Sequence, residues 1–180
     1  VTPYIPHRID EGYGLSIVGI QSLESKIQNI KLIITVDNGI VANKAVDFAN
    51  EQGIDIIITD HHVPSNPTTG SGLPKAFAIV HTTKLCGTGV AYLLSQEIKN
   101  RHSGLSRIDS GVLWTSQSPQ NDVKKDSHLE LVALATVADL VPLKGQNRTL
   151  LKFGLEALKK TKRIGLLELF KEAGLEKNSI

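Results

Sequence analysis

Lys31–Asp37 reads K-L-I-I-T-V-D, and Ile54–Thr59 reads I-D-I-I-I-T. Both stretches have the length of a strand, are rich in β-branched residues and are apolar on both faces, which is typical of strands in the middle of a parallel sheet. Between them, residues 41–52 carry apolar side chains at helical spacing, and Gly53 follows at the position expected of a helix-ending glycine. A strand, a helix and a strand in this order predict a βαβ unit, whose crossover is almost always right-handed.

The rest of the chain extends this pattern to an open α/β domain. The further predicted elements are a strand at 76–80 and helices at 90–100, at 128–140, from residue 147 onward and at 164–173. Because the 128–140 segment is apolar almost all round, we expect that helix to be buried inside the domain. Residues 64–75 and 103–127 are polar and predict loops.

We therefore expect one α/β domain over residues 1–180, with an open, mostly parallel sheet flanked by helices. Within it, we expect an α/β core at 1–143 and C-terminal helices at 147–180.

The composition is that of a globular chain. Of 180 residues, 41% are hydrophobic and 21% are charged, which excludes a disordered tail, and no apolar run reaches the roughly 18 residues that span a bilayer. The single cysteine, Cys86, cannot form an internal disulfide, which fits a reducing compartment, and we expect a cytoplasmic protein. The net charge of +2 permits an anionic ligand but is far from the strongly basic balance of a dedicated DNA-binding module.

Acidic and imidazole side chains follow both central strands. Asp37 ends the first strand, and Asp60, His61 and His62 follow the second. Because the carboxyl ends of parallel strands meet at one edge of a sheet, where open sheets bind ligands, we expect these four side chains to converge. Mixed Asp and His ligands suit a borderline divalent ion such as manganese, and the absence of Cys argues against a structural zinc site. The alternative is that Asp37 and Asp60 only form turns at the strand ends.

Asp139 points to a cation from an independent direction. It interrupts the apolar 128–140 helix, and a buried carboxylate is costly without a partner. That partner is either a Lys or Arg side chain or a metal shared with the strand-end groups. His128, at the other end of the helix and about 16 Å away along its axis, is not expected to share the metal.

Three weaker features stay open between two interpretations. The Gly87-Thr88-Gly89 turn at a predicted helix start suits either a phosphate held by backbone N–H groups or close packing. The basic residues within 159–163 suit either a nucleic-acid contact or a solvated helix end. His7, His81 and His102 lie in polar surroundings and are predicted to be surface or loop residues.

The segment T-D-H-H-V-P at Thr59–Pro64 resembles the motif that names the DHH phosphoesterase superfamily. This superfamily includes single-strand exonucleases, oligoribonucleases, cyclic-dinucleotide phosphodiesterases and manganese pyrophosphatases, so the motif alone leaves the substrate open. Further segments resemble the RecJ-type 5′-to-3′ exonucleases in order and spacing, and the match covers most of the chain. They are Y-I-P-H-R-I-D-E-G-Y-G-L (4–15), T-V-D-N-G-I (35–40), L-C-G-T-G-V-A-Y (85–92), A-L-A-T-V-A-D-L-V-P-L (133–143) and N-R-T-L-L-K-F-G-L (147–155).

The resemblance implies a DHH-type catalytic domain with a role for each strand-end residue. Asp37, His61 and Asp139 correspond to metal ligands, and Asp60 and His62 correspond to catalytic residues beside the metals and the scissile phosphate. The implied cofactor is Mn²⁺ or Mg²⁺, with two ions in the complete protein. Such ions activate water for in-line attack on phosphorus.

The resemblance also implies a substrate. We expect a metal-dependent exonuclease that acts on single-stranded DNA in repair and recombination, with no membrane partner. Arg8, Gly87 and Gly89 would contact substrate phosphate. The alternatives are a small-substrate phosphohydrolase of the same family or a non-catalytic member that binds nucleic acid.

The chain departs from the family's pattern at both of its ends and in one loop. The family's Asp-x-Asp segment, which supplies further metal ligands, would precede Val1, and its second, substrate-binding domain would follow Ile180. The chain contains no methionine. We therefore expect a piece of a longer protein that by itself binds metal weakly and has little nuclease activity. The family usually has Asn-Pro near Val80-His81, so we expect the loop there to differ.

Overall fold

The computed structural model describes residues 1–65, 72–102 and 128–175. Residues 66–71 of the predicted loop at 64–75 and all of the predicted loop at 103–127 lie outside these residues. The chain divides into two compact units, Val1–Thr83 and Lys84–Ile180. The predicted division between a core at 1–143 and C-terminal helices at 147–180 stays a prediction.

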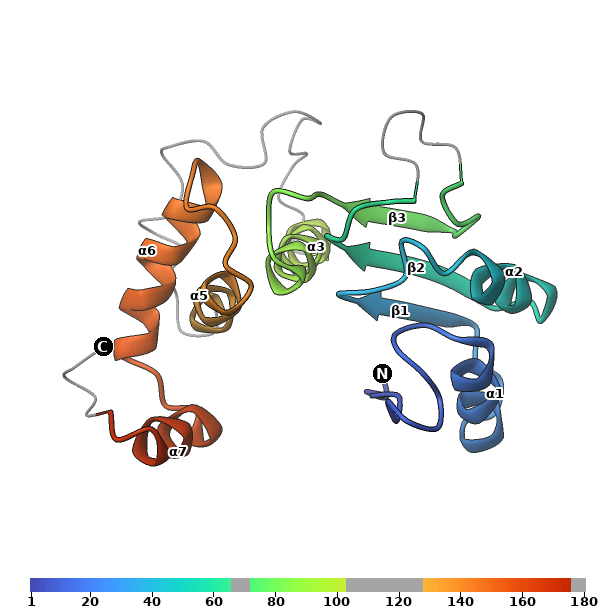
Figure 1. Ribbon diagram of the computed structural model, residues 1–180, viewed down its shortest axis with the longest axis horizontal. Coiled ribbons are helices and arrows are strands. Elements are labelled where there is room, and N and C mark those ends of the chain that lie inside the picture. Colours follow the sequence, from blue (N-terminus) through green and yellow to red (C-terminus); the bar gives the residue numbers. More distant parts are fainter. Residues whose placement is uncertain (66–71, 103–127, 176–180) are drawn as a thin grey trace. The chain divides into compact units, whose positions relative to one another are not determined.

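The first unit is built on a parallel sheet of three strands in the order β1-β2-β3. The strands are β1 (Leu32–Val36), β2 (Asp55–Asp60) and β3 (Ala78–His81). All three arrows point in the same direction in Figure 1, so the carboxyl ends of the strands share one edge. The predicted open parallel sheet with flanking helices is confirmed.

The described part of this unit also contains two helices, α1 (Ile17–Lys26) and α2 (Asn43–Glu51). Their apolar side chains form one buried cluster with the sheet, made of Ile20, Ala45, Val46, Ala49, Ile54, Ile56 and Ile58. The predicted helix at 41–52 is confirmed as α2, whose C-cap is followed by Gly53 at a φ of 70°. Helix α1 was not predicted, because its apolar residues are concentrated in its first seven positions instead of forming a regular stripe.

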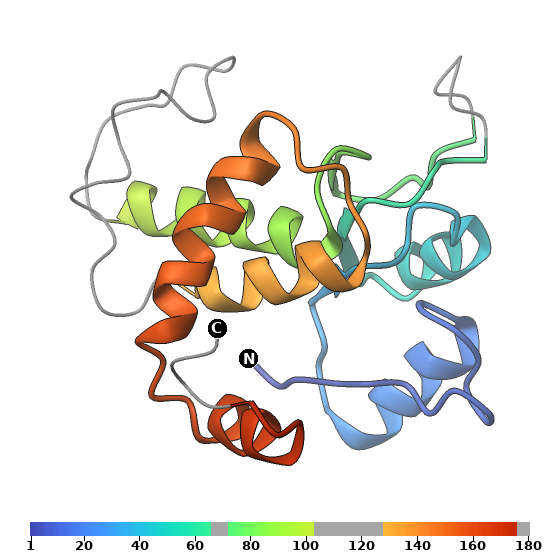
Figure 2. The ribbon, with the colours of Figure 1, turned by 60° about the vertical axis from the view of Figure 1, so that its left-hand side comes forward.

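The second unit consists of helices in its described part: α3 (Gly87–His102), α5 (Leu129–Ala138), α6 (Gln146–Lys159) and α7 (Ile164–Glu172). Figure 2 shows α5 lying alongside α3, and α6 crosses α5. The crossing is close at Gly154, where a Cβ atom would lie 2.5 Å from the Leu129 carbonyl oxygen and 2.6 Å from the Ala133 Cβ. Glycine is therefore required by the packing of α6 on α5.

The end of α5 differs from the expectation. The helix stops at Ala138, and Asp139 follows as its exposed C-cap. Leu140 then takes a left-handed φ of 53°, and Val141 N donates to Thr136 O at 3.2 Å, as in a Schellman motif. Val137 is 54% exposed and Leu140 is 86% exposed, so the prediction of a helix buried all round is wrong at this end.

Among the described helices, none is long and apolar enough to cross a membrane.

Candidate metal centre

Asp37 lies in a hydrogen-bonded turn directly after β1. Asp37 N still pairs with Thr59 O at 2.9 Å, but its backbone takes a left-handed φ of 65°. Asn38 Nδ2 donates to Val36 O at 2.9 Å, and Thr35 Oγ1 donates to Asn38 O at 2.7 Å. Asp tolerates this backbone better than most residues do, and strained backbone positions concentrate at functional sites.

Asp60, the last residue of β2, is buried and holds both loops that surround it. Its Oδ2 accepts from Ile40 N at 2.9 Å, in the loop after β1. Its Oδ1 accepts from His61 N at 2.7 Å, from His62 N at 3.2 Å and from His62 Nδ1 at 2.7 Å. Because a carboxylate only accepts, His62 carries its proton on Nδ1 in this contact.

The hydrogen-bond donors around Asp60 keep its carboxyl group ionised. Burial raises the pKa of this carboxyl, but hydrogen bonds from Ile40 N, the His62 ring and the His61 and His62 amides outweigh it and hold the pKa below its usual value. Asp60 is therefore an ionised anchor behind the two histidines. Its contacts favour a positioning role, and the catalytic role implied by the resemblance stays a prediction.

Asp37, His61 and His62 form a compact cluster at the carboxyl edge of the sheet. Their ligand atoms all lie within 4.8 Å of one another, and His61 Nε2 lies 3.0 Å from Asp37 Oδ1. The two imidazole rings are 4.6 Å apart between centroids. The predicted convergence of the strand ends is observed.

The donor set fits a divalent cation. One carboxylate oxygen and imidazole nitrogens suit a borderline ion such as Mn²⁺. The Asp37 side chain is 49% exposed and that of His61 is 18% exposed, so solvent reaches the cluster. A phosphate ligand can therefore approach a bound ion.

Asp139 belongs to the second unit. The argument that it lies buried within an apolar helix is wrong, because α5 ends before it and its side chain is exposed. Its role as a metal ligand now rests on the resemblance alone and stays a prediction.

The predicted phosphate contacts have their own local partners. The Arg8 guanidinium lies 5.0 Å from the centre of the Tyr13 ring, in the exposed segment before α1. At the start of α3, Gly87 and Gly89 are buried, and Gly89 N donates to Cys86 Sγ at 3.4 Å. This bond favours a packing role for Gly89, and the phosphate contact of all three predicted residues stays a prediction.

His81 is the residue that the sequence analysis missed. It was predicted to be a surface or loop residue, but it ends β3 in register with Asp60, and its Nε2 lies 2.7 Å from His62 O. The predicted strand at 76–80 could have placed it at the same sheet edge as Asp60.

Three further basic or imidazole residues have their own places within the described part of the chain. His7 is exposed, as predicted, and His128, which was predicted at the N-terminal end of the helix, is the N-cap of α5. Arg163 Nε donates to Glu130 Oε1 at 2.6 Å, so this member of the basic cluster is held inside the second unit.

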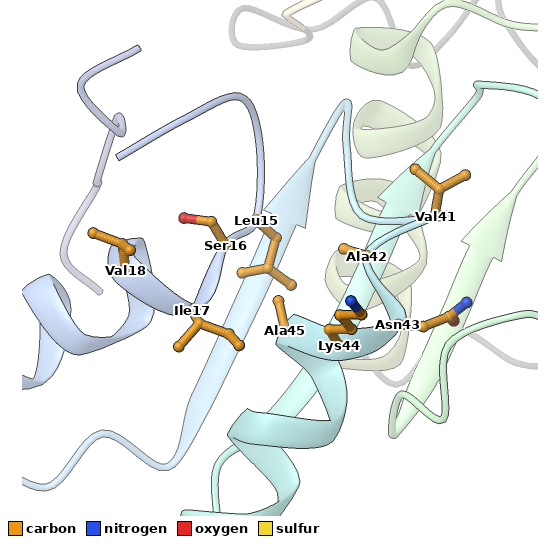
Figure 3. Close-up of a pocket in the computed structure, with 9 residues that line it drawn as sticks. All are labelled: Leu15, Ser16, Ile17, Val18, Val41, Ala42, Asn43, Lys44 and Ala45. Atoms are coloured by element: carbon orange, nitrogen blue, oxygen red, sulfur yellow. The ribbon is translucent and has the colours of Figure 1, made fainter. Parts of the chain in front are cut away.

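A surface pocket of about 470 Å³ lies at the starts of α1 and α2. Figure 3 shows side chains from the start of α1, such as Ile17, facing those from the start of α2, such as Ala45. Asp37, Asp60, His61 and His62 are not among its lining residues. We therefore place the candidate site at the polar cluster, where the metal-binding side chains converge, and not in this mainly apolar pocket.

Comparison with known proteins gives relatives whose names are consistent with this chemistry. The chain is 38% identical over 180 residues to the single-stranded-DNA-specific exonuclease RecJ of Bacillus subtilis, covering 95% of this chain and 19% of that protein. It is 34% identical over 179 residues to the exonuclease of the same name from Escherichia coli, covering 94% of this chain and 29% of that protein. The chain thus spans less than a third of these relatives' length.

Solved structures and a family match agree with these relatives. A crystal structure of exonuclease RecJ bound to manganese matches with a TM-score of 0.69 and 29% identity, covering 99% of this chain and 41% of that one. RecJ from Thermus thermophilus in complex with Mn²⁺ matches with a TM-score of 0.64 and 27% identity, covering 88% of this chain and 22% of that one. The family described as "DHH family, N-terminal domain" matches residues 1–136. Since this match covers well over half of the residues, the chain belongs to the DHH family.

Proposed function

We propose that the protein is a metal-dependent phosphodiester hydrolase that degrades single-stranded DNA from its 5′ end. The observation that carries the proposal is the convergence of Asp37, His61 and His62 at the carboxyl edge of a parallel sheet. Relatives at 38% and 34% identity are named single-stranded-DNA-specific exonucleases, and two similar solved structures contain manganese. A role in DNA repair and recombination and a cytoplasmic location belong to the same proposal.

The residues that would hold the metal are Asp37 and His61, which lie in contact. Asp139 is proposed as a further ligand from the family resemblance alone. Mn²⁺ or Mg²⁺ is the proposed ion, and two ions are expected in the complete protein. When bound, such an ion acts as a Lewis acid that activates water and offsets the charge developing on the phosphate.

His62 is the proposed proton carrier of the site. Its Nδ1–H donates to ionised Asp60, which fixes the ring and leaves Nε2 as the ring nitrogen that faces away from this anchor. An imidazole held in this way can accept a proton from water on Nε2 and pass that proton to a leaving oxygen. Arg8 would bind a neighbouring phosphate through its guanidinium.

The proposal is tested by incubating the full-length protein with 5′-labelled single-stranded DNA and Mn²⁺. We expect release of nucleotides from single strands, little from duplexes, and a loss of at least about a hundredfold in Asp37→Ala, because that substitution removes a ligand of the metal. Asp47→Ala is the matched control, since Asp47 is an exposed carboxylate on α2. Full activity of Asp37→Ala would refute the proposal.

Other outcomes would identify the alternatives. Hydrolysis confined to dinucleotides, cyclic dinucleotides or pyrophosphate would indicate a small-substrate phosphohydrolase. DNA binding without hydrolysis would indicate a non-catalytic member of the family.

A further inference from the structure

His81 lies beside the DHH tripeptide through the pairing of β3 with β2. The register places His81 opposite Asp60, at the shared carboxyl edge of the two strands. Its side chain is half-buried, and its Nε2 contacts the loop that follows β2. The strand pairing thereby brings a third imidazole to the edge that carries His61 and His62.

The contact between His81 and this loop has a defined direction. His81 Nε2 lies 2.7 Å from the backbone oxygen of His62. A backbone carbonyl accepts hydrogen bonds and cannot donate them, so Nε2 of His81 must carry the proton. The bond thereby fixes the peptide plane that follows His62.

His62 is held from two sides. Asp60 accepts from both its backbone N–H and its ring Nδ1, at 3.2 Å and 2.7 Å. His81 holds the carbonyl at the other end of the same residue. The amide and the carbonyl of His62 are both held at the sheet edge, so its backbone has little freedom to move. The His62 ring therefore stays beside Asp37 and His61.

We infer that His81 is a positioning residue, which holds the His62 ring in the geometry needed for phosphodiester hydrolysis by donating a hydrogen bond to the His62 carbonyl. The inference rests on the proposed function for the role of His62, but the contact itself does not depend on it. Because His62 acts during bond cleavage in this scheme, losing the contact should reduce turnover more than substrate binding.

The test compares three variants of the full-length protein. His81→Leu removes the donor, whereas His81→Gln places an amide Nε2 the same number of bonds from Cβ. Asn50→Leu is the matched control, because Asn50 Nδ2 donates to Lys75 O at 2.9 Å in an equivalent side-chain-to-backbone bond away from the cluster.

We expect His81→Leu to lower kcat on single-stranded DNA by about three- to tenfold, the effect of one hydrogen bond, with KM changed less than about twofold. His81→Gln should recover most of that loss, and Asn50→Leu should match the wild type. An unchanged kcat in His81→Leu would overturn the inference. So would a loss in His81→Gln as large as that in His81→Leu, or an equal loss in Asn50→Leu.

A second measurement separates this inference from the proposed function. In ¹⁵N-histidine NMR spectra, we expect a protonated Nε2 on wild-type His81, and faster solvent exchange of the His62 Nδ1–H in His81→Leu than in the wild type or His81→Gln. If the wild type fails to hydrolyse DNA, the proposed function fails and the exchange rates still decide the role of His81. An unprotonated Nε2 on His81, or equal exchange in all variants, would overturn the inference, and the wild-type spectrum decides it if His81→Leu does not fold.

Discussion

Asp60 links the two loops that carry the candidate metal centre. One carboxylate oxygen accepts from the Ile40 amide after β1, and the other accepts from the His61 and His62 amides after β2. A single buried anion thereby holds the spacing between Asp37 and His61, which come from different strands. The cost of burying this charge is offset by N–H donors.

Glu11 gives a residue-scale prediction about pH. The Tyr4 hydroxyl and His7 N both donate to its Oε2, the latter at 2.8 Å. The hydrogen bond from Tyr4 is the main reason that the pKa of Glu11 falls from 4.5 to about 2. We expect Tyr4→Phe to return this pKa toward 4.5, measured by ¹³C NMR of the Glu11 carboxyl.

The sign of the pH dependence follows from the lowered pKa. The stabilisation that Glu11 contributes is fully present above about pH 4.5 and is lost as the pH falls toward 2, because the unfolded chain binds the proton first. Tyr13→Phe serves as the control, since it removes a hydroxyl in the same segment. A Glu11 pKa of about 2 in Tyr4→Phe would show that the Tyr4 contact is not its cause.

At the scale of elements, the crossing of α5 and α6 is held at a contact distance that only glycine allows. A Cβ at Gly154 would collide with backbone of α5, at Leu129 O, and with Ala133 Cβ. We expect Gly154→Ala to lower the free energy of unfolding by about 1–3 kcal/mol, the usual cost of overpacking. The measurement is denaturant unfolding followed by circular dichroism.

Gly165 provides the internal control for this prediction. It lies in α7, and a Cβ there would have no heavy atom within 4 Å. Since alanine favours helix over glycine, Gly165→Ala should leave stability unchanged or raise it by up to about 1 kcal/mol. Equal destabilisation by both substitutions would contradict a packing role for Gly154.

The sequence predicts elements well where a hydrophobic pattern is continuous and poorly where tertiary contacts decide. The runs at 31–37 and 54–59 predict two strands that are observed with small shifts of their ends, and Gly53 marks the end of α2. Helix α1 was missed because only its packing on α2 and the sheet reveals its buried side. The predicted helix at 128–140 extends beyond the observed end of α5. Leu140 takes a left-handed backbone there, which an apolar residue rarely adopts and which the sequence therefore does not predict.

At the scale of the whole molecule, topology brings the candidate site together from residues far apart in sequence. The parallel βαβ unit predicts the meeting of Asp37 with His61 and His62, because the carboxyl ends of its strands share an edge. The βαβ unit does not predict the hydrogen bonds that hold these side chains in place. The hydrogen bonds from the Ile40 amide to Asp60 and from His81 to the His62 carbonyl depend on loop geometry that no periodic pattern encodes.

The most direct test of the metal centre is electron spin echo spectroscopy of Mn²⁺ bound to the full-length protein. We expect a nitrogen modulation from imidazole in the wild type, reduced modulation in His61→Ala, and Mn²⁺ affinity at least about tenfold weaker in that variant. His7→Ala, which removes an exposed histidine outside the cluster, should behave as the wild type. Unchanged modulation and affinity in His61→Ala would show that His61 is not a ligand of the metal.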